Sequence, residues 1–137
     1  MAGRKGLRLE MKIEIDEPIK SVLVVEDEAI LSLMMEDLLL EMGATQVDCF
    51  TAVADAAGAA RANHYDCAIL DVRLRDGDSG DIASILAERG IPFVFTTGSD
   101  TSSLAREHQD RPFLAKPFSD DQFKTLLLDT HMLAGQR

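Results

Sequence analysis

The chain has 137 residues, of which 46% are hydrophobic and 28% are charged, a balance typical of one globular domain and not of a disordered chain. Its 14 Lys and Arg against 24 Asp and Glu give a formal net charge of −10, which argues against nucleic-acid binding and favours divalent cations or basic protein partners. Neither a membrane span, which needs an apolar run of about 18 residues, nor a secretory signal is predicted. Cys49 and Cys67 form no metal-binding pattern and are expected to be small buried residues of a cytoplasmic protein.

Alternating residues near the N-terminus predict a strand at residues 7–16. In LRLEMKIEID every second side chain is apolar and those between are charged, which would give a strand one apolar and one charged face. Pro18 ends the pattern, so residues 1–19 form an N-terminal extension to the domain. We expect the strand to cover a sheet edge, either of its own sheet or of a second chain in a homodimer, and a disordered tail is the alternative.

From Ser21 onward, short apolar runs alternate with segments of helical pattern. The runs predict strands at 21–25, 46–50, 67–71, 92–97 and 112–116. Helices are predicted at 28–42, 52–62 (behind the candidate N-cap Thr51), 80–89 and 99–108, and a last helix follows the capping box of Ser119 and Gln122. Because strands that are apolar throughout are buried on both faces, we predict a doubly wound α/β domain over residues 20–134, with a five-stranded parallel sheet and helices on both faces.

Polar residues follow four of these strands. Glu26 and Asp27 come after the first, Asp71 ends the third, Thr97 ends the fourth and Lys116 ends the fifth. The carboxyl ends of parallel strands share one edge of the sheet, where ligands of such folds bind, so these side chains are expected to converge. Carboxylates this close repel one another and one lysine is too little to neutralise them, which predicts a Mg²⁺ site with all-oxygen ligands.

Each of these residues also has a plainer interpretation. Asp27 could cap the helix at 28–42, Lys116 could be a solvated charge, and Thr97 could be an ordinary residue at a strand end. We favour the functional interpretation because matching residues occur together at the ends of several strands. With the metal bound, an oxygen of Asp71 would be a nucleophile toward phosphorus, and Lys116 and Thr97 would contact the phosphoryl oxygens.

In five ordered blocks the sequence resembles the receiver domain of two-component response regulators. The blocks are VLVVEDE (22–28), AILDVRL (68–74), DGDSG (76–80), IPFVFTTG (91–98) and FLAKPF (113–118). The resemblance implies a flavodoxin-like sheet of strand order 2-1-3-4-5. It also implies that Asp71 is the phospho-acceptor, that Asp27 binds Mg²⁺ directly and Glu26 binds it through water, and that the backbone carbonyl of Arg73 is a further ligand.

The resemblance assigns roles to other residues of the site. Thr97 is the expected switch hydroxyl, Lys116 the phosphate-binding lysine, often in a cis peptide bond with Pro117, and Phe113 the switch aromatic, where tyrosine is frequent. Arg73 and Ser99 hold the positions that tune the lifetime of the phosphoryl group. The chain departs from many receivers at Arg75, where proline is common.

The resemblance implies a stand-alone receiver that takes its phosphoryl group from a histidine kinase or a histidine phosphotransfer protein. It would then act by protein contact or as a phosphate sink, as a phosphoryl acceptor and not an enzyme. An aspartyl-phosphate hydrolase is the enzymatic alternative, but its second acidic residue is missing from Asp71-Val72-Arg73. A receiver with a decayed site and a nucleotide-binding flavodoxin-like protein are further alternatives, and the intact site residues and the lack of a glycine-rich turn after the first strand disfavour them.

The helix at 28–42 is unusually apolar. A buried stripe is expected from its spacing, and Leu33 and Leu40 fall on the opposite side. These two leucines are either scattered surface residues or a docking surface for the kinase helices. The expected stripe consists of Leu31, Met34, Met35, Leu38 and Met42.

Overall fold

Five parallel strands form the centre of the protein and confirm the predicted sheet. We describe a computed structural model over residues 19–98 and 108–135, with side chains to residue 130. The strand order is β2-β1-β3-β6-β7, which is the predicted order 2-1-3-4-5 once two short strands outside this sheet are counted in the numbering. The strands are β1 (Ser21–Val25), β2 (Gln46–Phe50), β3 (Cys67–Asp71), β6 (Phe93–Thr97) and β7 (Phe113–Ala115).

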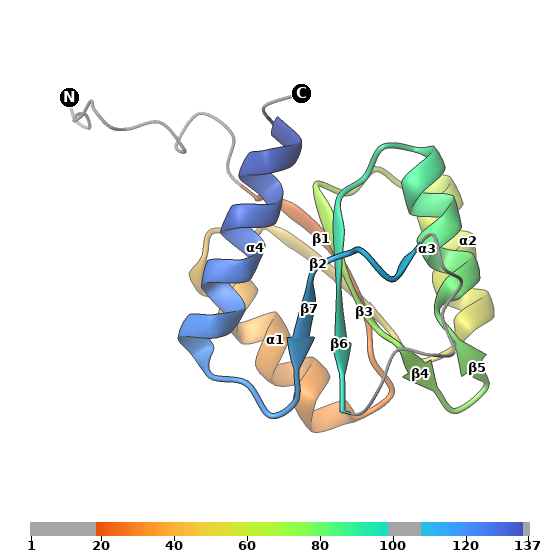
Figure 1. The fold of residues 1–137 in the computed structure, drawn as a ribbon, viewed down its shortest axis with the longest axis horizontal. Helices are drawn as coiled ribbons and strands as arrows, with labels where there is room; N and C mark the ends of the chain where they lie inside the picture. The colour runs from red at the N-terminus through yellow and green to blue at the C-terminus, as the bar shows by residue number, and fades with distance from the viewer. Residues whose placement is uncertain (1–18, 99–107, 136–137) are drawn as a thin grey trace.

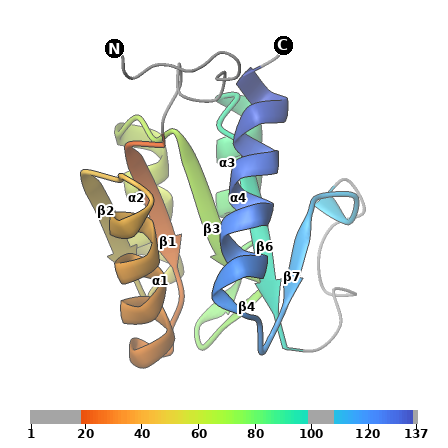
Figure 2. The same cartoon turned by 90° about the vertical axis from the view of Figure 1, so that its left-hand side faces the viewer.

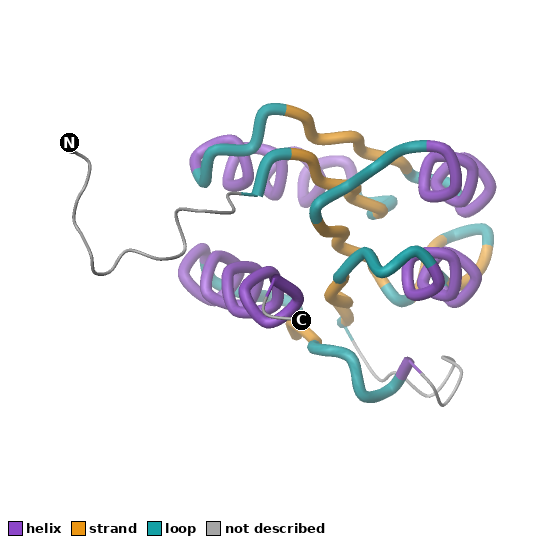
Figure 3. The backbone as a smooth tube through the Cα atoms, turned by 90° about the horizontal axis from the view of Figure 1, so that it is seen from above, coloured by secondary structure: helices purple, strands orange, loops and turns teal. Residues whose placement is uncertain are grey.

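Helices cover both faces of this sheet, α1 and α4 on one side and α2 and α3 on the other (Figure 1). Alternate strand residues explain the two layers, since Val22 and Val24 pack with α1 and α4 while Leu23 and Val25 pack with α2 and α3. Seen from above, the strands run between the two helix layers (Figure 3). The helices are α1 (Ala29–Glu41), α2 (Val53–Ala62), α3 (Gly80–Glu88) and α4 (Asp120–Gly135).

A small antiparallel hairpin follows β3, where the sequence predicts only a turn-rich loop. Its strands, β4 (Arg73–Leu74) and β5 (Gly77–Asp78), have two residues each, and Leu74 pairs with Gly77 across the tip. Gly77 has a φ of +146°, a conformation that side chains with a Cβ rarely adopt, which explains glycine after the tip. The hairpin lies beside the carboxyl end of the main sheet (Figure 1).

Two predictions about buried residues are wrong in part. On α1, Met35 and Leu38 are buried as expected, but Leu39 completes the buried set and Met34 is 48% exposed. The helix is apolar on most of its circumference, so its spacing does not fix which side faces the sheet. Cys67 is buried in β3, whereas Cys49 is exposed because it lies on the edge strand β2.

The N-terminal cap of α4 agrees with the sequence prediction, whereas that of α2 differs from it. The capping box of α4 is confirmed, since Gln122 N–H donates to Ser119 Oγ at 3.0 Å and Ser119 N–H donates to Gln122 Oε1 at 2.8 Å. Thr51 does not cap α2, whose N-cap residue is Ala52. Instead the Asp76 carboxylate, from the tip of the hairpin, accepts the Val53 N–H at 3.0 Å.

Several sequence predictions concern residues outside the described ones. The strand at 7–16, with the homodimer that depends on it, lies there, as do residues 99–107 of the helix predicted at 99–108, Ser99 among them. These therefore stay predictions. Among the helices that the structure describes, none has both the length and the apolar character that a membrane crossing requires.

Candidate metal and phosphoryl-transfer site

The predicted site residues converge on one edge of the sheet. Figure 2 shows the arrowheads of the main strands pointing the same way, toward the edge where these residues lie. Glu26 and Asp27 follow β1, Asp71 ends β3, which lies beside it, and Thr97 ends β6. Lys116 follows β7, and its N–H donates to the Thr97 carbonyl at 2.8 Å.

Three carboxylates form the centre of the site. Glu26, Asp27 and Asp71 each offer one oxygen, and these oxygens lie within 4.8 Å of one another. Glu26 is fully buried and Asp71 is 6% exposed, so water screens their mutual repulsion poorly. Such a cluster requires nearby positive charge to remain ionised.

Lys116 supplies positive charge to this cluster. Its Nζ donates a hydrogen bond to Asp71 Oδ2 at 3.1 Å and lies 3.0 Å from Glu26 Oε1 and 3.6 Å from Glu28 Oε1. The side chain is only 19% exposed, so the interpretation of Lys116 as a solvated charge is wrong. The expected cis peptide bond between Lys116 and Pro117 is present.

The electrostatics show that Lys116 does not fully compensate the carboxylates. Burial raises the pKa of Glu26 to about 7, against the opposing effects of the Glu28 N–H, which donates to Glu26 Oε2 at 3.0 Å, and of Lys116. Burial alone would lower the pKa of Lys116, but the Glu26 and Asp71 carboxylates outweigh it and raise this pKa. One ammonium therefore faces more negative charge than it can neutralise.

The donor set fits a magnesium ion. Glu26 Oε1 is buried and lies 3.0 Å from Lys116 Nζ, and it accepts no aligned hydrogen bond from the residues that the structure describes, so it can still accept a ligand contact. Carboxylate oxygens without nitrogen or sulfur donors are the ligands that Mg²⁺ prefers. Arg73, whose backbone carbonyl is the further predicted ligand, begins β4 with an exposed side chain two residues after Asp71, and its role stays a prediction.

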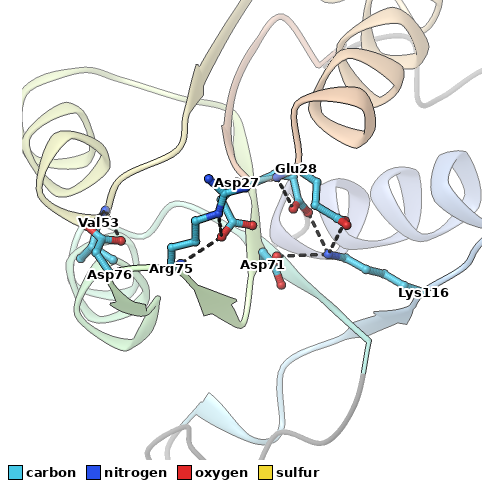
Figure 4. A network of polar contacts seen from close by, with 8 residues as sticks. Asp27, Glu28, Val53, Asp71, Arg75, Asp76 and Lys116 are labelled. Atoms are coloured by element: carbon cyan, nitrogen blue, oxygen red, sulfur yellow. Dashed lines mark hydrogen bonds and ion pairs between the residues drawn. The ribbon is translucent and has the colours of Figure 1, made fainter.

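Asp27 has a partner that the sequence does not predict. The N–H of Arg75 donates to Asp27 Oδ2 at 2.9 Å, and the Arg75 Nε lies 3.8 Å from the same oxygen. Asp27 does not cap α1, because the N-cap residue is Glu28 and no side chain caps this helix. Figure 4 shows the tip of the hairpin beside Asp27, with Asp71 and Lys116 on the other side of this carboxylate.

The structure also describes the other residues that the sequence singled out. Thr97 is 7% exposed at the end of β6, and the half-buried Phe113 ring stacks on Phe95 with centroids 5.8 Å apart. On α1, Leu33 and Leu40 are 59% and 49% exposed.

Sequence reasoning missed several contacts of the site. Glu28 and the tip residues Arg75 and Asp76 were not assigned contacts, although the acidic run EDE and the turn sequence RDGD contain them. Ile30, which lies in the first turn of α1 and is 77% exposed, was also not singled out from the sequence, because it belongs neither to the expected buried stripe nor to the pair of leucines opposite it.

Comparisons with known proteins give consistent matches to one domain type. A family model described as the response regulator receiver domain matches residues 22–128. The solution structure of SdrG from Sphingomonas melonis Fr1 is similar at 39% identity and a TM-score of 0.72, over 83% of this chain and 97% of that one. A structure of SdrG in its BeF3-activated conformation, with the source given as Pseudomonas melonis Fr1, is 38% identical over 83% of this chain and 98% of that one, with a TM-score of 0.65.

A third similar structure is the receiver domain of the sensor histidine kinase PA1611 from Pseudomonas aeruginosa PAO1, which holds a magnesium ion in its active-site cleft. It is 21% identical, has a TM-score of 0.72, and the alignment covers 82% of this chain and 98% of that one, so it supports the fold. The comparison with curated proteins gives no match.

Proposed function

We propose, since the chain belongs to the response regulator receiver domains of two-component systems, that Asp71 accepts a phosphoryl group from a histidine kinase or phosphotransfer protein in a Mg²⁺-dependent reaction. The observation that carries this proposal is the cluster of Glu26, Asp27 and Asp71 with Lys116 at the carboxyl edge of the sheet. The receiver domain extends over residues 20–134 and residues 1–19 precede it as an extension.

The chemistry follows from the position of Asp71. An oxygen of its carboxylate attacks the phosphorus of a phosphohistidine, an O–P bond forms as the N–P bond breaks, and the imidazole nitrogen keeps the bonding electrons and takes up a proton. Mg²⁺ held by Glu26, Asp27 and Asp71, with the Arg73 carbonyl as a further ligand, would supply positive charge opposite the phosphoryl oxygens.

Lys116, Thr97 and Phe113 complete the proposed site. The Lys116 ammonium, now 3.1 Å from Asp71, would pair with a phosphoryl oxygen once Asp71 is modified. The Thr97 hydroxyl would donate to another phosphoryl oxygen, and the Phe113 ring on the adjacent strand β7 would shift with it and report the state of the site at the surface. Arg73 and Ser99 would set how quickly water removes the group.

The surface of α1 supports a partner interaction beside this site. Ile30, Leu33, Met34 and Leu40 are all large, apolar and 48% to 77% exposed, which is unusual for four residues of one helix. An open groove lies between the first turns of α1 and the Lys116–Phe118 segment, so it adjoins the proposed phosphoryl site. We therefore favour the docking surface for the kinase or phosphotransfer helices, with Leu33 and Leu40 as part of it, over scattered surface leucines.

A further part of the proposal is how the phosphorylated protein acts on other proteins. We infer that it acts as a single-domain regulator, either through contacts made by its modified state or by draining phosphoryl groups from its donor. The similarity to SdrG, which has a BeF3-activated conformation, supports a form that responds to modification. Its two free cysteines suit a reducing compartment, and we place the protein in the cytoplasm.

The experiment is phosphorylation by a small donor such as acetyl phosphate with Mg²⁺, followed by intact mass measurement. Wild type should gain the mass of one phosphoryl group, and the gain should vanish in Asp71→Asn and when a chelator removes Mg²⁺. Asp78→Asn is the matched control, because Asp78 lies in the nearby hairpin and its carboxylate accepts a hydrogen bond from the Gly80 N–H, which an amide oxygen can also accept. Persistent modification of Asp71→Asn would place the acceptor elsewhere.

A further inference from the structure

The tip of the β4–β5 hairpin makes contact with the loop that follows β1 and with the start of α2. Arg75 and Asp76 are the two residues of the tip, between the paired residues Leu74 and Gly77. The Arg75 N–H donates to Asp27 Oδ2 at 2.9 Å, while the Asp76 carboxylate accepts the Val53 N–H at the start of α2. Figure 4 shows the tip between these two partners.

The Arg75 N–H restricts the orientation of Asp27. A free carboxylate on a short side chain can rotate, and the bond from a backbone N–H fixes one of its two oxygens in place. The other oxygen of Asp27 lies on the Asp71 side in Figure 4. The side chain of Asp27 is 15% exposed, so water competes little for the fixed oxygen.

The guanidinium of Arg75 has a smaller effect on the same carboxylate. Its Nε is 3.8 Å from Asp27 Oδ2 and the side chain is 84% exposed, so solvent screens the attraction. The part of Arg75 that matters is therefore its backbone, which any residue except proline would provide. Asp76 holds that backbone in position by its bond to α2.

We propose that Arg75, through its backbone N–H, is a positioning residue that turns Asp27 toward the metal, with Asp76 as the anchor of the hairpin tip. The proposal rests on the proposed function, since it assigns Asp27 as a Mg²⁺ ligand. Groups that orient metal ligands from outside the coordination sphere change metal affinity by about 10- to 100-fold when they are lost. The hairpin is thus part of the metal site although it offers no ligand atom from its tip.

Magnesium titration by calorimetry tests the proposal with two matched variants. Arg75→Ala removes the guanidinium and keeps the N–H, so Mg²⁺ affinity should stay the same or rise by at most about fivefold, an increase that high salt abolishes. Arg75→Pro removes both, and its Mg²⁺ affinity should fall at least about tenfold below that of Arg75→Ala. Circular dichroism establishes that both variants are folded.

A second pair decides the question if Arg75→Pro does not fold. Asp76→Asn and Asp76→Ala lose the same charge, but only asparagine keeps an oxygen that accepts the Val53 N–H. The alanine variant should therefore bind Mg²⁺ several-fold more weakly than the asparagine variant. Equal affinities within the deciding pair would overturn the positioning role, whereas a wild-type protein that binds no Mg²⁺ would instead refute the proposed function.

Discussion

Replacing Lys116 by methionine tests whether one ammonium neutralises the carboxylate cluster. Methionine keeps the unbranched side chain, one atom shorter, and removes the charge, which lies 3.0 Å from Glu26 Oε1 and 3.1 Å from Asp71 Oδ2. Breaking a fully buried pair costs about 3–5 kcal/mol. Lys116 is 19% exposed, and Glu26 can take up a proton because its pKa is already about 7, so we expect a loss of about 2 kcal/mol without metal.

Magnesium should reverse part of this loss. Without Lys116 the ion no longer competes with an ammonium for the same oxygens, so it should bind the variant more tightly than wild type. An affinity gain of about tenfold adds about 1.4 kcal/mol to the stabilisation by saturating Mg²⁺. Urea unfolding with and without Mg²⁺ measures both effects.

Lys124→Met is the matched control for this measurement. Lys124 Nζ lies 2.9 Å from Glu41 Oε1 in an exposed ion pair between α4 and α1, and neither residue belongs to the carboxylate cluster. We expect little change in stability and the same response to Mg²⁺ as wild type. If Lys116→Met were as stable as wild type without metal, or if Mg²⁺ stabilised both proteins equally, Lys116 and the ion would not share these carboxylates.

Three further predictions concern other parts of the protein. Tyr65→Phe removes a hydroxyl that donates to Asp48 at 2.6 Å and should cost about 1–2 kcal/mol of stability at neutral pH. Burial raises the pKa of the Tyr65 hydroxyl to about 12. The protonated hydroxyl therefore contributes its full stability below about pH 10, where a free tyrosine ionises, and this stability is lost as the pH rises through about 12. In pH-dependent unfolding, the phenylalanine variant should lack this alkaline loss. Leu33→Glu should slow phosphotransfer from the cognate kinase about tenfold and leave acetyl phosphate labelling intact, whereas Leu128→Glu, on the exposed surface of α4, should change neither. Equal loss in both assays would indicate damage to the fold. If the segment at 7–16 pairs between chains, deleting residues 1–17 should convert a dimer to a monomer in light scattering, and an unchanged oligomeric state would exclude dimerisation through this segment.

The sheet was predictable because its strands have a simple physical signature. β1, β3 and β6 are buried on both faces, so their residues are apolar almost throughout, and the predicted bounds agree with the structure to within one residue. The position of Asp71 and Lys116 near one another followed from the same reasoning, because the carboxyl ends of parallel strands share an edge.

Other features leave no such signature in the sequence. The strands of the hairpin have two residues each, too few for an alternating pattern, and α1 has apolar residues on most sides, so its buried face depends on the sheet it meets. The contact of Arg75 with Asp27 joins residues 48 positions apart and uses a backbone N–H, which every residue except proline possesses. No residue type marks such a bond.

The excess negative charge of the carboxylate cluster is unfavourable for folding and favourable for binding a divalent cation. A fully buried glutamate with a pKa of about 7 is costly, and an apolar residue of similar volume in its place is often neutral or stabilising for folding. Lys116 does not remove that cost, because it also faces Asp71 and Glu28. Folding alone therefore gives no reason to bury Glu26 beside two aspartates, whereas a bound divalent cation does, since its attraction grows with the same excess of negative charge that destabilises the metal-free domain.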